Sequence, residues 1–166
     1  DAATKFAAVY MNNGTLNVSG STFNVYGDYT AGVYIKAGTI DIAKSECNVK
    51  GAHTNGIYSL VEGQGNFTVT DTNFTMTGGD SQMGIYAEKG EVSLRSTSTS
   101  TFQIAGADSK AVYAAAGSTI KSEGYTYTLS GATSQGVYST DGAVQVVNGA
   151  IKLKEASSAG IYTEGG

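Results

Sequence analysis

The single cysteine, Cys47, and the single histidine, His53, are the side chains best suited to nucleophilic catalysis in this sequence. A thiolate nucleophile needs a base within hydrogen-bonding distance, so the two side chains would have to meet. Cys47 falls at a position that aromatic residues occupy elsewhere in a repeat described below, whereas His53 falls in a predicted turn beside Gly51. We therefore expect Cys47 to be a buried, inert hydrophobic residue that makes no dyad with His53.

Carboxylates are the second group with catalytic potential. Polysaccharide lyases and hydrolases use clustered acids, for calcium binding or acid–base work, usually with a basic residue beside them. Asp28, Asp80 and Asp108 fall near equivalent corners of the repeat and could form a weak acidic ridge. Aspartate also favours turns by bonding to local backbone, and the one arginine, Arg95, lies elsewhere. The sequence therefore predicts no catalytic residue, no cofactor, no metal site and no enzyme.

Tyrosine offers a different chemistry, the recognition of a sugar ring or a protein surface. Seven tyrosines end a tripeptide of a small residue, a β-branched residue and tyrosine, at intervals of 24, 24, 28, 27, 25 and 24 residues. They form a possible binding face: Tyr10, Tyr34, Tyr58, Tyr86, Tyr113, Tyr138 and Tyr162. The competing interpretation is that a column of stacked tyrosines only stabilises the fold.

The regular spacing of these tyrosines indicates a repeat architecture. Each unit contains three short apolar alternations whose starts lie 7, 7 and 10 residues apart, as in the series Val33, Ile40/Ile42 and Cys47/Val49. Apolar residues at i and i+2 predict short strands with one buried face. Because equivalent strands stack in the same direction, we expect an all-β, right-handed parallel β-helix, a three-faced solenoid of about six coils of 24–28 residues.

Strand alternation also predicts which side chains of the tripeptide face the solvent. The β-branched residue, such as Val33, should point into the core, and the tyrosine after it should point outward. Cys47 should lie inside with Phe23 and Phe74, since all three occupy the same column. The whole of residues 1–166 is expected to be a single β-helix segment, a fragment of a longer array.

Composition agrees with a β-rich fold and disfavours two classes of partner. Glycine is frequent, at 23 residues, proline is absent, and only 14% of residues are charged, for a net charge of −4. The cationic residues form no basic stripe, so nucleic-acid binding is not expected. No apolar run approaches the roughly 20 residues that a membrane span requires, so no membrane insertion by this segment is expected.

The period breaks at a few corners, where residues are inserted. Three extra residues fall within residues 59–66 and three within residues 95–101, and single residues are added within 77–83 and 114–119. Insertions in solenoids become surface loops, which often carry binding, although a tolerant corner can also drift without function. The possible binding loops contain Glu62, Gln64, Asn66, Arg95, Thr97 and Thr99.

The repeat resembles that of a known class of proteins. The pattern Gly-Val-Tyr-x-x-x-Gly-x-Ile-x-Ile occurs at residues 32–42, and Ser/Thr-x-Gly-Val/Ile-Tyr occurs at residues 54–58 and 134–138. Both resemble the passenger repeats of bacterial autotransporters (type V secretion), especially those of large β-helical surface adhesins. The resemblance covers essentially the whole chain, but its motif is structural, so no catalytic residue can be carried over.

The resemblance implies a location and a function. It implies export through a Gram-negative outer membrane, a C-terminal β-barrel in the full-length protein, and extracellular display at the cell surface. The expected partners are surface proteins or glycans of host cells or of other bacteria, in adhesion or virulence. Two alternatives stay open: a carbohydrate-active β-helix enzyme (lyase or hydrolase), and a structural spacer that holds a distal binding tip.

Overall fold

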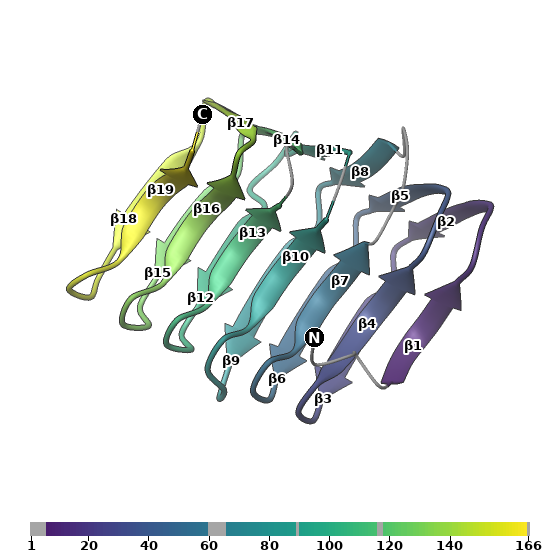
Figure 1. Cartoon of the computed structure of the whole chain (residues 1–166), viewed down its shortest axis with the longest axis horizontal. Helices are drawn as coiled ribbons and strands as arrows, with labels where there is room; N and C mark the ends of the chain where they lie inside the picture. The colour runs from purple at the N-terminus through teal and green to yellow at the C-terminus, as the bar shows by residue number, and fades with distance from the viewer. Residues whose placement is uncertain (1–5, 60–65, 89, 116–117, 166) are drawn as a thin grey trace.

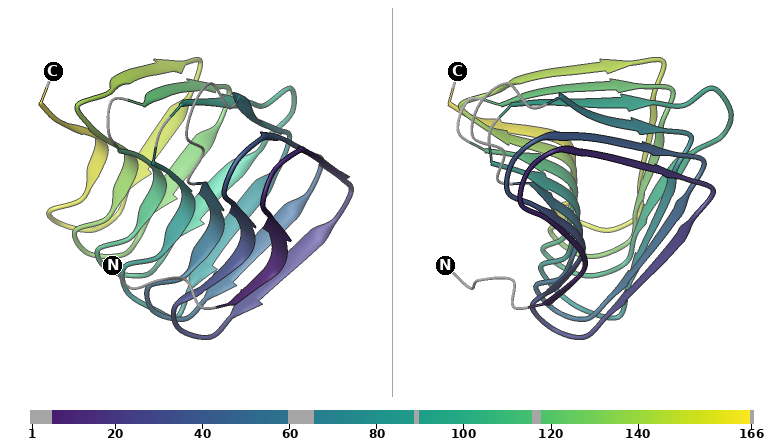
Figure 2. Two further views of the ribbon diagram at one scale, coloured as in Figure 1. Left: turned by 45° about the vertical axis from the view of Figure 1, so that its right-hand side comes forward. Right: turned by 90° about the vertical axis from the view of Figure 1, so that its right-hand side faces the viewer.

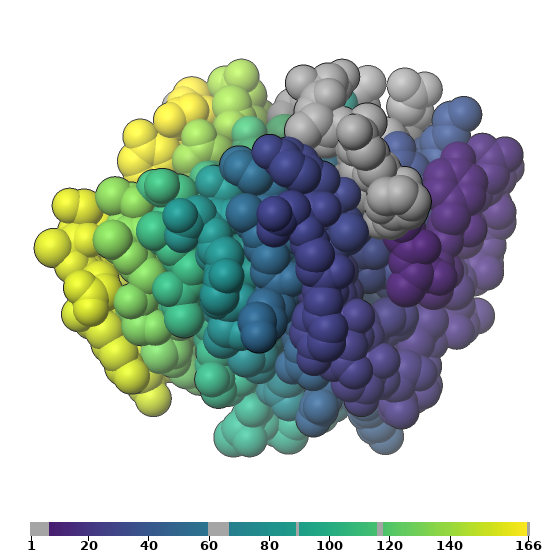
Figure 3. All heavy atoms as spheres, turned by 90° about the horizontal axis from the view of Figure 1, so that it is seen from below, coloured from purple at the N-terminus to yellow at the C-terminus, as the bar shows by residue number. Residues whose placement is uncertain are grey.

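The computed structural model describes residues 6–59, 66–88, 90–115 and 118–165. In these ranges the regular elements are all strands, and successive coils advance along one axis in a right-handed sense (Figure 1). The expectation of an all-β, right-handed, three-faced parallel β-helix of about six coils is confirmed. Viewed along the axis, the coils outline a triangle (Figure 2), and in the space-filling view they follow one another in chain order (Figure 3).

Each coil contributes one strand to each of three sheets, and every pair of neighbouring strands is parallel. The first sheet contains β1 (Phe6–Met11), β4 (Thr30–Ile35), β7 (Asn55–Ser59), β10 (Met83–Ala87), β13 (Lys110–Ala114), β16 (Gln135–Thr140) and β19 (Ala159–Glu164). The second contains β2 (Thr15–Ser19), β5 (Thr39–Ala43), β8 (Asn66–Thr70), β11 (Glu91–Arg95), β14 (Thr119–Glu123) and β17 (Ala143–Val147). The third contains β3 (Thr22–Tyr26), β6 (Glu46–Lys50), β9 (Asn73–Thr77), β12 (Thr101–Ile104), β15 (Thr126–Leu129) and β18 (Ala150–Leu153).

The core consists of side-chain columns that run along the axis between the three sheets. Val33 and Ile57 are paired across the first sheet and are almost fully buried. In the third sheet Cys47 pairs with Phe23 on one side and Phe74 on the other, and only 1% of Cys47 is exposed. The predicted inward position of Cys47 is therefore confirmed. So is the predicted inward direction of the β-branched residue in the tripeptide.

The small residue of the tripeptide also faces the interior, which simple strand alternation does not predict. A Cβ added to Gly56 would lie 2.8 Å from the Sγ of Cys47 and 2.6 Å from the carbonyl oxygen of Gly84. Two successive residues, Gly56 and Ile57, thus occupy the core side, and the first sheet bends inward in the view along the axis (Figure 2). A residue with a larger side chain would collide with the third sheet, so the tripeptide must begin with a small residue.

Polar side chains at the corners are buried and bonded to backbone. Between the second and third sheets, the Oγ of Ser45 donates to the carbonyl of Ala43 and accepts from the amide of Ser21. The Oγ1 of Thr72 in the next coil accepts from the amide of Ser45 in the same way. These hydroxyls take the place of water as hydrogen-bond partners for backbone groups that cannot pair within a sheet. The corners thereby keep their buried backbone groups hydrogen-bonded.

Candidate functional site

The seven predicted tyrosines form a continuous ladder along the outer side of the first sheet, which we call the tyrosine ladder. Tyr34 stacks on Tyr10 with ring centroids 5.4 Å apart and on Tyr58 at 5.2 Å, with interplanar angles of 11° and 3°. The remaining contacts, from Tyr58 to Tyr162, have centroid separations of 4.7–5.4 Å. The predicted outward direction of these side chains is confirmed, and Tyr10 at the end of the ladder is 62% exposed.

The ladder changes its geometry at Tyr113. This ring lies at 75° to Tyr86 and at 87° to Tyr138, in edge-to-face contacts, whereas Tyr138 and Tyr162 are again stacked at 3°. The ammonium of Lys110 lies 5.9 Å from the ring centroid of Tyr113 and 5.0 Å from that of Tyr138. The negative faces of the tyrosine rings favour both the edge-to-face contacts of Tyr113 and the cation–π contacts of the Lys110 ammonium.

The stacked inner rings of the ladder offer their surroundings ring edges and phenol hydroxyls rather than open ring faces. Each inner ring, such as that of Tyr34, has a neighbour on both sides. Burial raises the pKa of Tyr58 to about 12, with smaller contributions from Tyr86, Glu88 and Tyr34. Burial likewise raises the pKa of Tyr86, again with a contribution from Glu88. The phenols of Tyr58 and Tyr86 therefore stay uncharged well above neutral pH. Sugar stacking on a stacked inner ring such as that of Tyr34 would require that ring to leave its neighbours.

The inserted corner at residues 95–101 is ordered by contacts with the preceding coil. The carboxylate of Asp71 accepts two hydrogen bonds from Thr97, one from its amide at 2.6 Å and one from its hydroxyl at 2.7 Å. These bonds hold the pKa of Asp71 below 3.8. At the other end of the corner, the amide of Thr101 donates to the Oδ1 of Asn73 at 2.9 Å. The insertion at residues 95–101 therefore forms an ordered, projecting corner beside the third sheet, which we call the ledge.

A buried tyrosine supports this corner from inside. Tyr125 is fully buried, its ring lies 5.4 Å from that of Phe102, and its hydroxyl accepts a hydrogen bond from the amide of Thr72 at 3.3 Å. Burial raises the pKa of Tyr125 to about 12, although the bond from Thr72 acts in the opposite direction. Ser100 is buried on the same side, so Thr99 is the last exposed hydroxyl before the next strand.

The residues of the predicted binding loops lie in different parts of the chain, and the structure does not describe all of them. Thr97 and Thr99 lie on the ordered ledge, and Arg95 ends β11 with its side chain exposed. Glu62 and Gln64 lie outside the described residues, and of Asn66 only its position at the start of β8 is described. The tyrosine ladder belongs to the first sheet and the ledge adjoins the third, so these two predicted regions lie on different faces of the solenoid.

The residues considered for catalysis make contacts that stabilise the fold. Burial raises the pKa of the Cys47 thiol to about 12, so this cysteine carries no thiolate near neutral pH. His53 is exposed at a corner with φ of 54°, and its ring stacks on Tyr29 at 4.9 Å. The Asp28 carboxylate accepts a hydrogen bond from the amide of Ala52, and that of Asp108 accepts one from the hydroxyl of Thr133. Asp28 and Asp108 therefore bond to the next coil, 24 and 25 residues along the chain, and not to local backbone as predicted.

Sequence reasoning missed the polar residues on the outer side of the third sheet. Asn48, Asn73, Thr75 and Gln103 line a shallow groove of about 300 Å³ beside the ledge. None of them belongs to a column of identical residues, because the groove combines different side chains from successive coils. The sequence could have indicated the groove, because strand alternation points these polar side chains outward and the strands lie next to an inserted corner.

The described residues form neither a metal-binding cluster nor a membrane-spanning helix. Within the four described ranges, no group of three or more histidine, cysteine, aspartate or glutamate side chains is placed to hold a metal ion. A helix long and apolar enough to cross a membrane is likewise not found among those residues. The sequence matches no protein-family model, no curated protein and no solved structure.

Proposed function

We propose that this chain is a segment of a bacterial cell-surface adhesin, in which the β-helix is a scaffold and its outer faces bind partners. The observation that carries the proposal is the contrast between the inner and outer columns. Val33, Ile57 and Ile85 repeat a β-branched apolar residue inside. One outer column of the third sheet instead reads Tyr26, Lys50 and Thr77. The fold thus requires apolar residues inside, whereas the outer side of the third sheet can present different chemistry in each coil.

The autotransporter-like repeat supports the location in this proposal. A solenoid extends by adding coils, each of which contacts only its neighbours, and this suits a long structure that projects from a cell. The proposed partners are proteins or glycans on host cells or other bacteria, and the proposed place is the extracellular side of an outer membrane. Binding rather than catalysis is proposed because the candidate nucleophile is buried and uncharged near neutral pH.

A direct test is the binding of the folded, fluorescently labelled chain to cultured epithelial cells and to bacteria. Saturable binding that excess unlabelled chain displaces is expected, and heat-unfolded chain should not compete. The flanking sequence provides a second test, since an adhesin of this class requires an outer-membrane export domain. If the folded chain shows no saturable binding to any cell surface, the adhesin proposal is wrong for this segment.

A structural spacer is the second candidate, and the tyrosine ladder favours it. The inner rings cover one another, as Tyr34 does between Tyr10 and Tyr58, so much of their surface is used to hold the coils together. A spacer would keep the ladder but would tolerate changes to exposed polar residues without loss of function. The cell-binding experiment separates the two candidates, because a spacer should bind nothing.

A further inference from the structure

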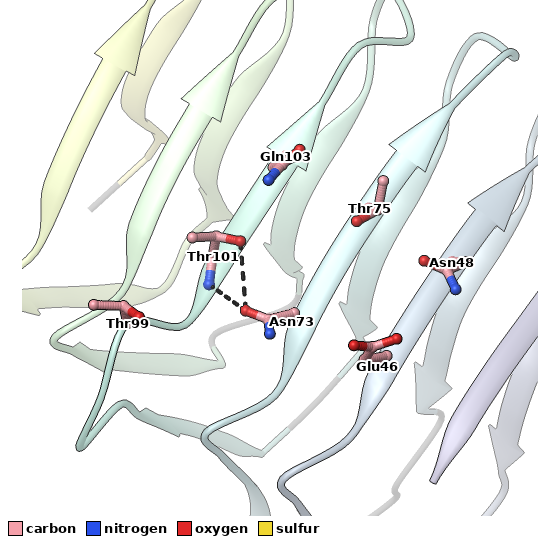
Figure 4. Close-up of a pocket in the computed structure, with 7 residues that line it drawn as sticks. All are labelled: Glu46, Asn48, Asn73, Thr75, Thr99, Thr101 and Gln103. Carbon is pink, nitrogen blue, oxygen red and sulfur yellow. Dashed lines mark hydrogen bonds between the residues drawn. The ribbon is translucent and has the colours of Figure 1, made fainter.

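The groove on the third sheet brings together polar side chains from three successive coils. They form two rows across β6, β9 and β12, and Thr99 on the ledge closes one end (Figure 4). Neighbouring strands lie about 4.8 Å apart, so each row spans roughly 10 Å along the solenoid axis. The two rows consist of Glu46, Asn73 and Thr101, and of Asn48, Thr75 and Gln103.

These side chains retain most of their hydrogen-bonding capacity. Within the described part of the chain, Glu46, Thr75 and Gln103 make no side-chain hydrogen bond. Asn73 uses its Oδ1 to accept from Thr101, which leaves its amide hydrogens directed to a ligand or water. Asn48 donates to Asn24 at 3.0 Å and keeps its own oxygen as an acceptor. The groove therefore offers several donors and acceptors at positions fixed by the strand register.

The arrangement is fixed by the surrounding structure. Residues 46–50, 73–77 and 101–104 are strands of one parallel sheet. The ledge that carries Thr99 is held on its outer side by Asp71 and from inside by the buried ring of Tyr125. A ligand would thus meet a preformed backbone surface, and binding would order the exposed side chains of Glu46 and Gln103.

The chemistry of the lining excludes several ligand classes. An apolar ligand would cover amides and hydroxyls without replacing their bonds to water, which is costly. An anion would meet the Glu46 carboxylate and no cationic lining residue among those described. A peptide that adds a strand needs a free sheet edge, whereas β9 in this groove is already paired on both sides. A ligand with many uncharged hydroxyl groups, each both donor and acceptor, fits all of these conditions.

We propose that this groove binds a short, uncharged oligosaccharide that lies along the solenoid axis. Asn48, Asn73 and Gln103 would supply amide donors and acceptors, Thr75 and Thr99 hydroxyls, and Glu46 an acceptor that also disfavours anionic sugars. The proposal rests on the proposed function, since it names a ligand class for one outer face of the adhesin segment. It concerns the third sheet and is independent of the tyrosine ladder.

The test is an array of immobilised neutral, sialylated and sulfated oligosaccharides, probed with the folded chain. The best neutral oligosaccharide is then titrated by calorimetry against the wild type and two groove variants, Gln103→Ala and Asn48→Ala. Each variant should weaken binding roughly 3- to 10-fold, the effect of losing a hydrogen bond. Gln145→Ala and Asn17→Ala are matched controls, because both residues are exposed on the second sheet, and they should leave the affinity unchanged.

Three outcomes would overturn the proposal: no neutral oligosaccharide binds, sulfated or sialylated sugars are preferred, or the groove variants bind like the controls. Circular dichroism shows whether each variant is folded, and the exposed position of Gln103 makes misfolding unexpected. Cell binding by Gln103→Ala separates this inference from the proposed function. Full cell binding by the variant would reject the groove but keep the adhesin, whereas failure of the wild type to bind cells would reject the adhesin alone.

Discussion

Cys47 illustrates how position in the repeat decides the chemistry of a single side chain. It occupies a column with Phe23 and Phe74, and its Sγ fills the space that Gly56 leaves by having no side chain. Burial removes the water that would stabilise a thiolate, which raises the pKa of Cys47 to about 12. A residue that would suggest catalysis on a surface is therefore a structural hydrophobic residue in this solenoid.

The Cys47 thiol should not react with a disulfide reagent at pH 8 while the protein is folded. Reaction should become fast only in denaturant, since both access and ionisation require unfolding. The control is a Cys47→Ala chain that carries Thr77→Cys, because Thr77 is exposed on the same sheet as Cys47 and its cysteine should react at once. Rapid labelling of Cys47 in the folded wild type would contradict its inward placement.

Tyrosine burial predicts loss of stability at alkaline pH. Tyr58 and Tyr125 have a pKa of about 12 in the folded chain, above the ordinary value of 10.0. Their neutral forms are favoured by folding, so this contribution to stability is complete below pH 10 and is lost as pH rises toward 12. The free energy of unfolding in urea should therefore fall steadily over this range.

Tyr58→Phe provides the control for the alkaline transition. The variant keeps the ring in the ladder but has no phenol to ionise, so its stability should fall less steeply between pH 10 and pH 12. Tyrosinate absorbance, measured on the same samples, shows how many phenols have titrated. Equal pH dependence in both proteins would mean that Tyr58 is not perturbed by folding.

At the scale of the element, the tyrosine ladder stabilises the stacking of successive strands in the first sheet. Tyr34 contacts two rings, whereas among the described residues Tyr162 contacts only the ring of Tyr138. Aromatic pairs contribute about 0.5–1.5 kcal/mol each beyond the area that they bury. The stability that each ring supplies should follow the number of its neighbours.

Tyr34→Ala should lower the free energy of unfolding by about 2 kcal/mol, and Tyr162→Ala by about half as much. Tyr34→Phe keeps both ring contacts and should be close to wild type. Urea denaturation followed by circular dichroism measures all three variants. Similar losses for Tyr34→Ala and Tyr162→Ala would show that stacking along the ladder does not set stability.

The inserted corner depends on one carboxylate. Asp71→Ala removes both acceptors of Thr97, so hydrogen exchange at the Thr97 amide should accelerate, while the Thr101 amide, bonded to Asn73, should keep its protection. Because the pKa of Asp71 is lowered, the same loosening is expected in the wild type only as the pH falls below 3.8. Asp41→Ala, at an exposed position on β5, is the control. Unchanged exchange at Thr97 in Asp71→Ala would disprove the anchor.

At the scale of the molecule, the solenoid is a one-dimensional stack in which each coil contacts the next. Every sheet pairs a strand with its counterpart one unit later, and almost no strand meets a partner further away. Stability is then approximately a sum of coil and interface contributions. Removing one complete coil should shorten the stack without changing the remaining pairs.

Deletion of residues 32–55, one complete period of 24, should give a folded protein that is somewhat less stable and about 5 Å shorter. Ala31 would then precede Gly56, in the position that Asn55 occupies. Deletion of residues 32–43, half a period, removes β5 and places the following corner and the start of β6 in first-sheet positions, which should prevent folding. Circular dichroism and small-angle scattering distinguish the two results. A folded half-period deletion would mean that the register is not set by the columns.

The sequence alone determined the period, the parallel stacking, the inward direction of Val33 and Cys47, and the outward direction of the tyrosines. These follow from local chemistry, because a β-strand alternates its side chains and a fixed period aligns equivalent positions. Only the tertiary structure decided the inward turn of Gly56, the rotation of Tyr113, the burial of Tyr125 and the polar groove. Those features depend on contacts between different coils, such as the bond from Thr72 to Tyr125, 53 residues apart. No local pattern encodes which side chain fills a corner, since that is decided by the space the neighbouring coils leave.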